Sequence, residues 1–333
     1  MLDKDPDLYK DIWIYAEHSG NKIVNVCFEL LGEASSLAAK LDCSVCAVLI
    51  GNDVRPLVDE LFKWGADKVY IFENENLEIF NLEAYAKVIS KAIIKHKPEI
   101  FLIGSTIEGR AIAPKIAGRF GLGLIAEGAG FNIGENRNLV VDRYSFGGLV
   151  LSKVVTVDTR PQMVTVRAGM MRALEKDESR TGEIIPITAE IGGDDLLTKL
   201  IGVAKAPKKY VGLTEAEIVV SGGRGVGGSE GFELIQKLAD KLNGVVGASR
   251  VAVDMGWVGY EHQVGQAGST VKPRIYIAAG ISGASQHLVG MWQSEIVIAI
   301  NTHPYAAIFE FADYGIVGDL FEVIPKLIEE LDK

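Results

Sequence analysis

Cysteine is scarce in this sequence of 333 residues, which contains only Cys27, Cys43 and Cys46. Three thiols are too few for a disulfide scaffold, and too few for a four-cysteine iron–sulfur cluster within this chain. Cys43 and Cys46 have the C-x-x-C spacing of redox motifs, but they enter an apolar run, "CSVCAVLI", and lack the helix N-terminus that lowers a thiol pKa. We expect a buried structural pair, with any iron–sulfur centre in another chain.

Long apolar runs and clusters of basic residues are also missing. No apolar run reaches the roughly 18 residues of a membrane span. The formal net charge is −10 and no segment forms a basic stripe, so we expect no nucleic-acid partner. The first twenty residues contain acids and an early proline where a secretory signal has a basic and then an apolar region, which predicts a cytoplasmic protein.

Two further absences narrow the chemistry. His18, His96 and His303 are scattered, with no second ligand at metal spacing, so we expect no metal site. The first half has no P-loop, so we assign no ATP site to it. We also assign no catalytic residue.

Length and hydrophobic pattern predict an α/β protein of two domains. A chain of this length exceeds one ordinary core, and 48% apolar with 23% charged residues is typical of a globular protein. Short apolar runs alternate with amphipathic ones, which is the order of a mainly parallel sheet with flanking helices. The basic stretch "KAPKKY" at 205–210 has the composition of a linker, so we divide the chain into domains 1–205 and 206–333.

The expected elements form two series. In the first domain we predict strands Ile12–Ala16, Val45–Ile50, Lys68–Phe72 and Ile100–Gly104, and helices Val26–Leu41, Val54–Trp64, Leu82–His96 and about Glu108–Phe120. Three later β-rich runs, "LVVDRYSFGGLVLSKVVTV", "PQMVTVRAG" and "GEIIPITAEI", are assigned to the same domain. In the second domain we predict strands Glu217–Ser221, Val245–Ser249, Arg274–Ala279 and Ile296–Asn301, and helices Gly231–Leu242, Gln286–Met291 and Leu320–Leu331.

The stretch "VVSGGRGVGG" at 219–228 contains Gly223-x-Gly225-x-x-Gly228, the glycine spacing of a dinucleotide-binding loop. A loop between a strand end and a helix start offers backbone N–H groups to a phosphate, and Arg224 suits a bidentate phosphate contact. The nicotinamide fingerprint also needs an acid about 20 residues further on, where this chain reads "ASR" at 248–250. A plain tight turn therefore remains an alternative for the glycine pattern.

Two more polar, glycine-containing stretches lie in the same domain. "GQAG" at 265–268 combines small residues with one amide, which suits the edge of a flat heteroaromatic group, although a surface turn would look the same. "GISGASQH" at 280–287 follows a predicted strand and begins a helix, and open α/β sheets bind ligands at such strand ends. Together the stretches predict a nucleotide site.

These stretches resemble the electron-transfer flavoprotein alpha subunit. The motifs "SGGRG", "VGASRVAVD", "QVGQAG", "GISGASQHLVGM", "IVIAIN" and "ADYGIVGDLFEVIPKL" follow in matching order over about Glu217–Leu331, and "IWIYAE", "GADKVY", "PEIFLIGST" and "TRPQMVTVRAGM" extend a looser resemblance over the first domain. The resemblance implies a Rossmann-like FAD-binding C-terminal domain and an N-terminal domain that contacts a beta subunit. It also implies the FAD-binding residues Arg224, Ser249, Arg250, Gln263, Val264, Gly265, Gln266, Ala267, Gly268, Ser282, Gly283, Ala284, Ser285, Gln286, His287, Asn301 and Asp319.

The resemblance places five of these residues along the cofactor. Arg224 and Ser249 would lie by the phosphates or nearby cofactor atoms, and Arg250 by the isoalloxazine ring. Asn301 and Asp319 match positions that hold the adenosine end.

Three positions bear on the flavin potential. Reduction puts negative charge on the ring, so a nearby cation or donor such as Arg250 or His287 would raise the potential. Arg250 could instead be a surface ion-pair arginine, and His287 a helix-start histidine bonded to backbone. Ala267 stands where the family often has Thr or Ser, so it cannot donate a hydroxyl hydrogen bond to flavin N5, unless its backbone N–H or Ser269 substitutes.

The family resemblance leaves two functions open. The chain is expected either to carry electrons from dehydrogenases to an acceptor such as a quinone oxidoreductase, or to belong to an electron-bifurcating complex that oxidises NADH and reduces ferredoxin or flavodoxin together with a higher-potential acceptor such as a quinone or an enoyl-CoA. The longer N-terminal stretch "YKDIWIYAEHSGNKIVNVCFELLGEASSLAAKL" resembles the bifurcating group. The beta subunit would hold AMP in the first case and a second FAD in the second. A third hypothesis, that the chain is an NAD-dependent dehydrogenase, rests on the glycine loop alone.

Overall fold

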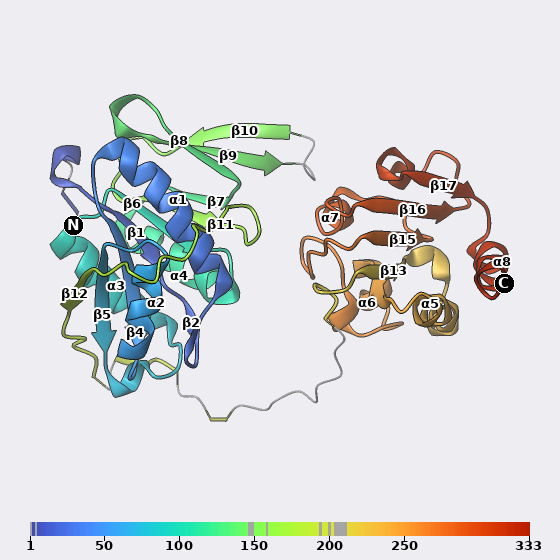
Figure 1. Ribbon diagram of the computed structural model, residues 1–333, viewed down its shortest axis with the longest axis horizontal. Helices are drawn as coiled ribbons and strands as arrows, with labels where there is room; N and C mark the ends of the chain where they lie inside the picture. Colours follow the sequence, from blue (N-terminus) through green and yellow to red (C-terminus); the bar gives the residue numbers. More distant parts are fainter. Residues whose placement is uncertain are drawn as a thin grey trace. The chain divides into compact units, whose positions relative to one another are not determined.

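The computed structural model describes residues 2–3, 5–145, 150–157, 159–192, 195–198, 201–202 and 212–333. The chain divides into two compact units, one drawn from Met1–Ser145 and Leu151–Val203 and the other mainly from Ala204–Lys333 (Figure 1). The predicted linker "KAPKKY" lies outside the described residues, so the domain boundary at 205 stays a prediction. No helix in the described ranges combines the length and apolar character of a membrane span.

The first unit is built on a seven-stranded parallel sheet with the strand order β12-β5-β4-β1-β6-β11-β7. All residues of β4, β6 and β11 are buried, as expected for strands covered on both faces. The strands are β1 (Ile12–Tyr15), β4 (Val45–Gly51), β5 (Lys68–Glu73), β6 (Ile100–Gly104), β7 (Leu124–Gly128), β11 (Gln162–Val166) and β12 (Glu183–Pro186).

Helices cover both faces of this sheet. α1 (Asn25–Leu41) and α2 (Val58–Lys63) pack on one face, and α3 (Leu82–His96) and α4 (Ile107–Phe120) on the other. The helix predicted over 54–64 is α-helical only from Val58, and the residues before it, Arg55–Leu57, form a 3-10 segment. The part of the chain that the structure describes contains the 3-10 segments η1 (Pro6–Leu8), η2 (Arg55–Leu57), η3 (Glu75–Leu77), η4 (Glu135–Arg137), η7 (Arg224–Val226), η8 (Tyr260–His262) and η9 (Ala307–Phe311).

The β-rich runs of the first half serve two different sheets. "PQMVTVRAG" supplies β11, which lies between β6 and β7, and "GEIIPITAEI" supplies the edge strand β12. A separate three-stranded sheet has the order β10-β9-β8, and a two-stranded hairpin joins β2 to β3. These strands are β2 (His18–Ser19), β3 (Lys22–Ile23), β8 (Gly130–Ile133), β9 (Leu139–Ser145) and β10 (Val150–Val155).

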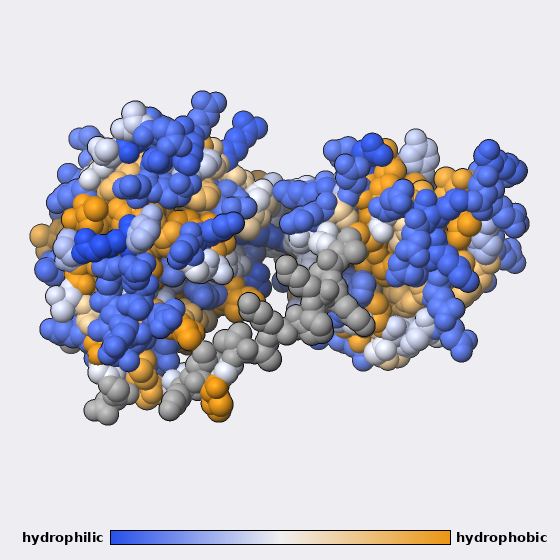
Figure 2. Space-filling model, turned by 60° about the horizontal axis from the view of Figure 1, so that its bottom comes forward, coloured by the Kyte–Doolittle hydropathy of each residue, from blue (hydrophilic) through white to orange (hydrophobic). Residues whose placement is uncertain are grey.

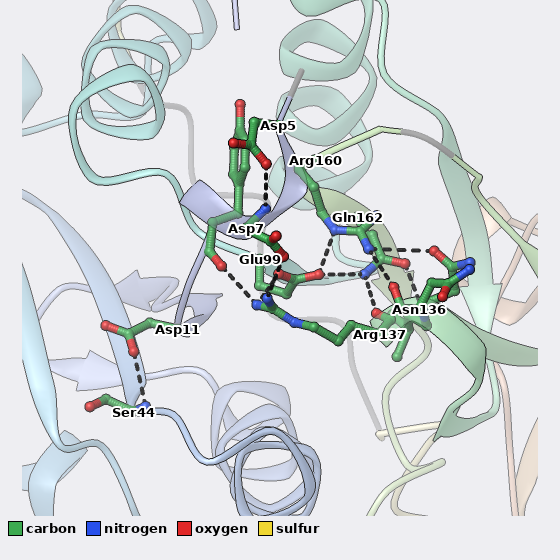
Figure 3. Close-up of polar contacts among 12 residues, drawn as sticks. Asp5, Asp7, Asp11, Ser44, Glu99, Asn136, Arg137, Arg160 and Gln162 are labelled. Carbon is green, nitrogen blue, oxygen red and sulfur yellow. Dashed lines mark hydrogen bonds and ion pairs between the residues drawn. The ribbon is translucent and has the colours of Figure 1, made fainter. Parts of the chain in front are cut away.

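A buried charged cluster connects the two larger sheets of the first unit (Figure 3). Glu99, just before β6, lies 2.5 Å from Arg160 Nε and 2.5 Å from Arg137 Nη2 and accepts a hydrogen bond from Gln162 Nε2 at 3.2 Å. The Gln162 side-chain oxygen accepts from the N–H of Leu139 at 2.6 Å. Because Leu139 begins β9 and Gln162 begins β11, the cluster fixes the small sheet to the large one.

The second unit contains a five-stranded parallel sheet with the order β14-β13-β15-β16-β17. Numbered within the unit this is 2-1-3-4-5, so the predicted Rossmann-like α/β fold is present with the doubly wound order of flavodoxin-like sheets. Its strands are β13 (Ile218–Gly222), β14 (Val245–Ala248), β15 (Ile275–Ala279), β16 (Ile296–Asn301) and β17 (Tyr314–Val317).

Both faces of the second sheet are packed. α5 (Ser229–Lys241), α6 (Arg250–Asp254) and α8 (Leu320–Leu331) cover one face. The segment around 264–271, α7 (Ser285–Leu288) and η9 cover the other face. Neither α6 nor β17 was predicted from the sequence, because α6 has only five residues and all four residues of β17 are exposed.

Candidate functional site

The candidate site lies where the strand order of the second sheet reverses. From β13 the chain crosses to β14 on one side, and then to β15 on the other side. The loops after β13 and β15 therefore leave in opposite directions, which opens a crevice at the carboxyl ends of the strands. Because all five strands are parallel, the predicted stretches that follow β13, β14, β15 and β16 share this edge.

The first two glycines of the 223–228 pattern bring two loops into backbone contact. The N–H of Gly223 donates to Ala279 O at 2.9 Å and that of Gly225 to Gly280 O at 3.0 Å. A Cβ at Gly223 would lie 2.3 Å from Gly280 O, and one at Gly225 would lie 2.8 Å from Gly280 Cα. Gly280 itself has a φ of 64°. The G-x-G spacing is thus required by loop packing, whatever the loop binds.

Hydrogen-bond donors suited to phosphate lie on both sides of that contact. Helix α5 begins after Gly228, which has no side chain to cap it, so its first-turn N–H groups are available. Arg224 is exposed and makes no ion pair with any residue that the structure describes. The N–H groups of residues 282–286 likewise donate to no acceptor in the described ranges. This set of donors fits a diphosphate.

The two other predicted stretches pack against each other. The N–H of Gln266 donates to Gln286 O at 2.7 Å. Gly265 has a φ of 139°, and a Cβ there would lie 2.7 Å from Gln286 O. A Cβ at Gly268 would lie 2.3 Å from Gln263 O. The structure therefore brings the 263–268 turn to the start of α7, as a shared binding site requires.

His287 is buried beneath this turn. Its side chain is on the first turn of α7, its residue is 6% exposed, and its Nε2 lies 2.9 Å from the hydroxyl of Tyr276 in β15. Burial lowers the pKa of His287 to about 4, although the Val264 backbone opposes the shift. The imidazole is therefore neutral at pH 7, so in this environment it is not a cation.

Ser249 and Arg250 follow β14 at the edge of the crevice. Ser249 is the N-cap residue of α6, and its Oγ is buried with no hydrogen-bond partner in the part of the chain that the structure describes. A buried hydroxyl without a partner fits a position that a ligand completes. Arg250 forms an exposed ion pair with Asp254 at 3.2 Å. Such a pair stabilises little, so the guanidinium can exchange it for another acceptor.

Asn301 and Asp319 already have partners within the protein. Asn301 Nδ2 donates to Ile281 O at 2.8 Å, which ties the end of β16 to the loop after β15. Asp319 caps α8, because its carboxylate accepts from the N–H of Phe321 at 2.9 Å. Both side chains therefore shape the loops at this edge.

Ala267 is exposed at the tip of the turn. Its carbonyl accepts a hydrogen bond from the Tyr260 hydroxyl at 2.8 Å, whereas its N–H has no acceptor among the described residues. The backbone of Ser269 is fully used, since its N–H donates to Gln263 O and its carbonyl accepts from Gly265 N. The Ala267 N–H is therefore the backbone group available to replace the missing hydroxyl, and the side-chain hydroxyl of Ser269 stays the other predicted substitute.

Tyr276, which contacts His287 beneath the candidate site, was not singled out from the sequence. In "RIYIAAG" it reads as one more apolar residue of a strand. Its hydroxyl was the feature that could have identified it, because a buried tyrosine hydroxyl needs a hydrogen-bond partner and so indicates a polar neighbour in the core.

The thiols behave as structural groups. Cys27, Cys43 and Cys46 are all free. Cys27 and Cys46 are buried, but Cys43 is only half-buried, so Cys43 and Cys46 are not the fully buried pair expected from the sequence. Burial raises the pKa of Cys27 to about 12 and that of Cys43 to about 11, which keeps both thiols protonated at neutral pH. In the ranges that the structure covers, no group of three or more His, Cys, Asp or Glu residues is arranged to hold a metal ion.

Comparison with known proteins assigns both halves of the chain. The Electron transfer flavoprotein domain family matches residues 12–191, and the Electron transfer flavoprotein FAD-binding domain family matches residues 212–292. The electron transfer flavoprotein subunit alpha of Thermoanaerobacterium thermosaccharolyticum is 52% identical, over 98% of this chain and 98% of that protein. The Megasphaera elsdenii subunit alpha is 43% identical, over 98% and 97%. A subunit of lactate dehydrogenase (NAD(+),ferredoxin) from Acetobacterium woodii is 39% identical, over 98% of this chain and 78% of that protein.

Proposed function

Because the chain belongs to the electron transfer flavoprotein alpha-subunit family and functions in flavin-dependent electron transfer, we propose that its second unit binds FAD at the carboxyl edge of the five-stranded sheet. As a heterodimer with a beta subunit, the chain then carries electrons from dehydrogenases to a downstream acceptor. The observation that supports this most is the meeting of the loops after β13, β14 and β15 at the reversal of strand order.

Different residues of the site would bind different parts of FAD. The uncapped start of α5, Arg224 and the N–H groups of residues 282–286 would bind the diphosphate. The 263–268 turn would supply backbone donors and close packing to the flavin, and the unpartnered Ser249 hydroxyl would complete a contact with the cofactor. FAD, when bound, supplies the one- and two-electron chemistry; the protein binds it, orients it and excludes water.

Arg250 would tune the potential of the bound flavin. Its guanidinium is exposed, and among the described residues it is paired only weakly, with Asp254. A cation beside the ring stabilises the negative charge that reduction creates. We expect Arg250→Ala to lower the reduction potential while FAD stays bound, and an unchanged potential would remove this role.

The small sheet of the first unit is the proposed contact with the beta subunit. Tyr144, Val150, Leu151 and Val155 of β9 and β10 are 44%, 43%, 53% and 38% exposed. Apolar patches interrupt the hydrophilic surface of this unit (Figure 2). Exposed apolar side chains gathered on one small sheet favour a protein partner.

Arg224→Ala tests the FAD site directly. Loss of charge-assisted hydrogen bonds to phosphate should raise the Kd for FAD about 10- to 100-fold, measured by fluorescence of the released flavin. Arg274→Ala is the matched control, because Arg274 is also exposed but precedes β15, at the opposite edge of the sheet. Equal retention of FAD by Arg224→Ala and wild type would refute the role of Arg224; a wild-type heterodimer without FAD would refute the function.

A second candidate, electron bifurcation, is favoured by one comparison, the similarity to the subunit of lactate dehydrogenase (NAD(+),ferredoxin). Purified heterodimer with one FAD and one AMP would support the simple carrier. Two FAD per heterodimer, together with NADH-driven reduction of ferredoxin or flavodoxin, would support the bifurcating complex.

A further inference from the structure

A buried pair of polar side chains lies beneath the proposed FAD site. Tyr276 is fully buried in β15, and its hydroxyl lies 2.9 Å from His287 Nε2 on α7. The two rings are 6.1 Å apart between centroids and inclined by 56°. The other ring nitrogen, His287 Nδ1, is also buried and lies beside the Val264 backbone, although no described acceptor meets hydrogen-bond geometry with it.

The surroundings of the Tyr276 hydroxyl decide which group donates. Burial raises the pKa of Tyr276, so the hydroxyl keeps its proton. Ser221, on the neighbouring strand β13, lies close enough to oppose that shift, but its Oγ makes no well-aligned hydrogen bond with a described residue. His287 Nε2 is thus the well-aligned partner of the hydroxyl. The hydroxyl can rotate to donate to Nε2, whereas Ser221 Oγ offers it no well-aligned acceptor, so we take the hydroxyl as the donor and Nε2 as the acceptor. The proton on Nδ1 is then left with the weaker contact, beside the Val264 backbone.

The tautomer of His287 follows from this direction. A neutral imidazole carries one N–H, so an accepting Nε2 leaves the proton on Nδ1. Nδ1 lies beside Val264, which belongs to the 263–268 turn. The buried donor therefore faces the backbone of the turn that, in the proposed function, borders the flavin.

We propose that Tyr276 is a positioning residue that holds His287 as its Nδ1–H tautomer, and that His287 in turn fixes the 263–268 turn against α7. The expected effect on FAD retention rests on the proposed function, whereas the tautomer of His287 does not. In this arrangement His287 contributes order to the turn and no charge to the flavin.

The test is ¹⁵N NMR of the full chain with its beta subunit, labelled at histidine. The chain has five histidines, so His287→Gln assigns the signal. Wild type should show His287 protonated on Nδ1 alone at pH 7. Tyr276→Phe should give the Nε2–H tautomer or a mixture, with about fivefold weaker retention of FAD. The matched control is Tyr260→Phe, which removes a tyrosine hydroxyl that donates to Ala267 O in the same turn. The tautomer of His287 should stay unchanged in this variant.

Two results would overturn the proposal: an Nε2–H tautomer in wild type, or the wild-type tautomer in Tyr276→Phe. If Tyr276→Phe does not fold, the wild-type spectrum alone decides, because a tyrosine that donated to Ser221 would leave His287 as the Nε2–H tautomer. A chain with the Nδ1–H tautomer that does not retain FAD would refute the proposed function and leave the tautomer standing.

Discussion

Glu99→Gln should destabilise the first unit by about 3 kcal/mol. Breaking a buried ion pair by removing one partner typically costs about 3–5 kcal/mol, because the other charge stays buried. The side chain of Glu99 is 1% exposed and that of Arg160 is 6% exposed, so this guanidinium would lose its carboxylate without gaining water. The side chain of Arg137 is 39% exposed and can be solvated, which places the expected cost at the low end of the range.

The assay must report the two units separately. Urea unfolding followed by pulsed hydrogen exchange and mass spectrometry resolves peptides of β6 and β11 from peptides of β13 and β15. We expect the midpoint to fall for the first pair of strands and to stay constant for the second. Glu73→Gln is the control, because the side chains of Arg55 and Glu73 are 59% and 28% exposed, so their pair is partly solvated and should contribute less than about 1 kcal/mol.

A small destabilisation of the first unit by Glu99→Gln would refute this reasoning. If Glu99→Gln costs no more than Glu73→Gln, the charge of Glu99 is dispensable, and the cluster in Figure 3 acts through shape and neutral hydrogen bonds. An equal loss in both units would show instead that the substitution acts on the whole chain.

Three more outcomes are expected. Gly280 has a φ of 64°, and a Cβ there would lie 2.9 Å from Gly225 Cα, so Gly280→Ala should destabilise the second unit and weaken FAD retention. Gly118 lies on α4 with open space around it, so Gly118→Ala should raise the free energy of unfolding by about 0.5–1 kcal/mol. Thermal denaturation of both variants compares these effects. His287 has a folded-state pKa of about 4, below its unfolded value of about 6.5, so the stability that its neutral form contributes is complete above pH 6.5 and falls as the pH drops toward 4. The second unit should therefore lose about 2 kcal/mol of stability between pH 7 and 5 in urea titrations. His287→Gln should show a smaller loss over the same range. Asp319→Ala should cost about 1 kcal/mol by removing the cap of α8, and Asp319→Asn should keep it; FAD affinity measured on both separates capping from cofactor contact.

The sequence was sufficient for most of the parallel strands and their carboxyl edges, although β7 and β17 were missed. Strands such as β4 and β6 are continuous apolar runs bounded by amphipathic helices, which is a local pattern. The stretches after β13 and β15 were predicted to share a site because strand ends of a parallel sheet share an edge. That inference needed no knowledge of distant contacts.

Features that depend on distant contacts could not be predicted. The spacing of Gly223 and Gly225 indicated a phosphate loop, but the steric reason for it is Gly280, which is far along the chain. The pair of Tyr276 and His287 is invisible to periodicity, because one residue reads as strand core and the other as a helix start. Strand β11 lies between β6 and β7 although it follows both in sequence, and no local pattern specifies such an insertion.

That insertion has a consequence for how the chain matures on the ribosome. Until Gln162–Val166 has been synthesised, β6 and β7 have no strand between them, and until Glu183–Pro186 follows, β5 has an open edge. Pairings between residues so far apart in sequence close slowly, and open edges invite association with other chains. Nascent chains arrested before residue 186 should therefore depend on chaperones. Among the described strands of the second unit the longest pairing joins Ile218 to Ile275, about half the separation in sequence between Lys68 and Glu183, so we expect a shorter dependence there.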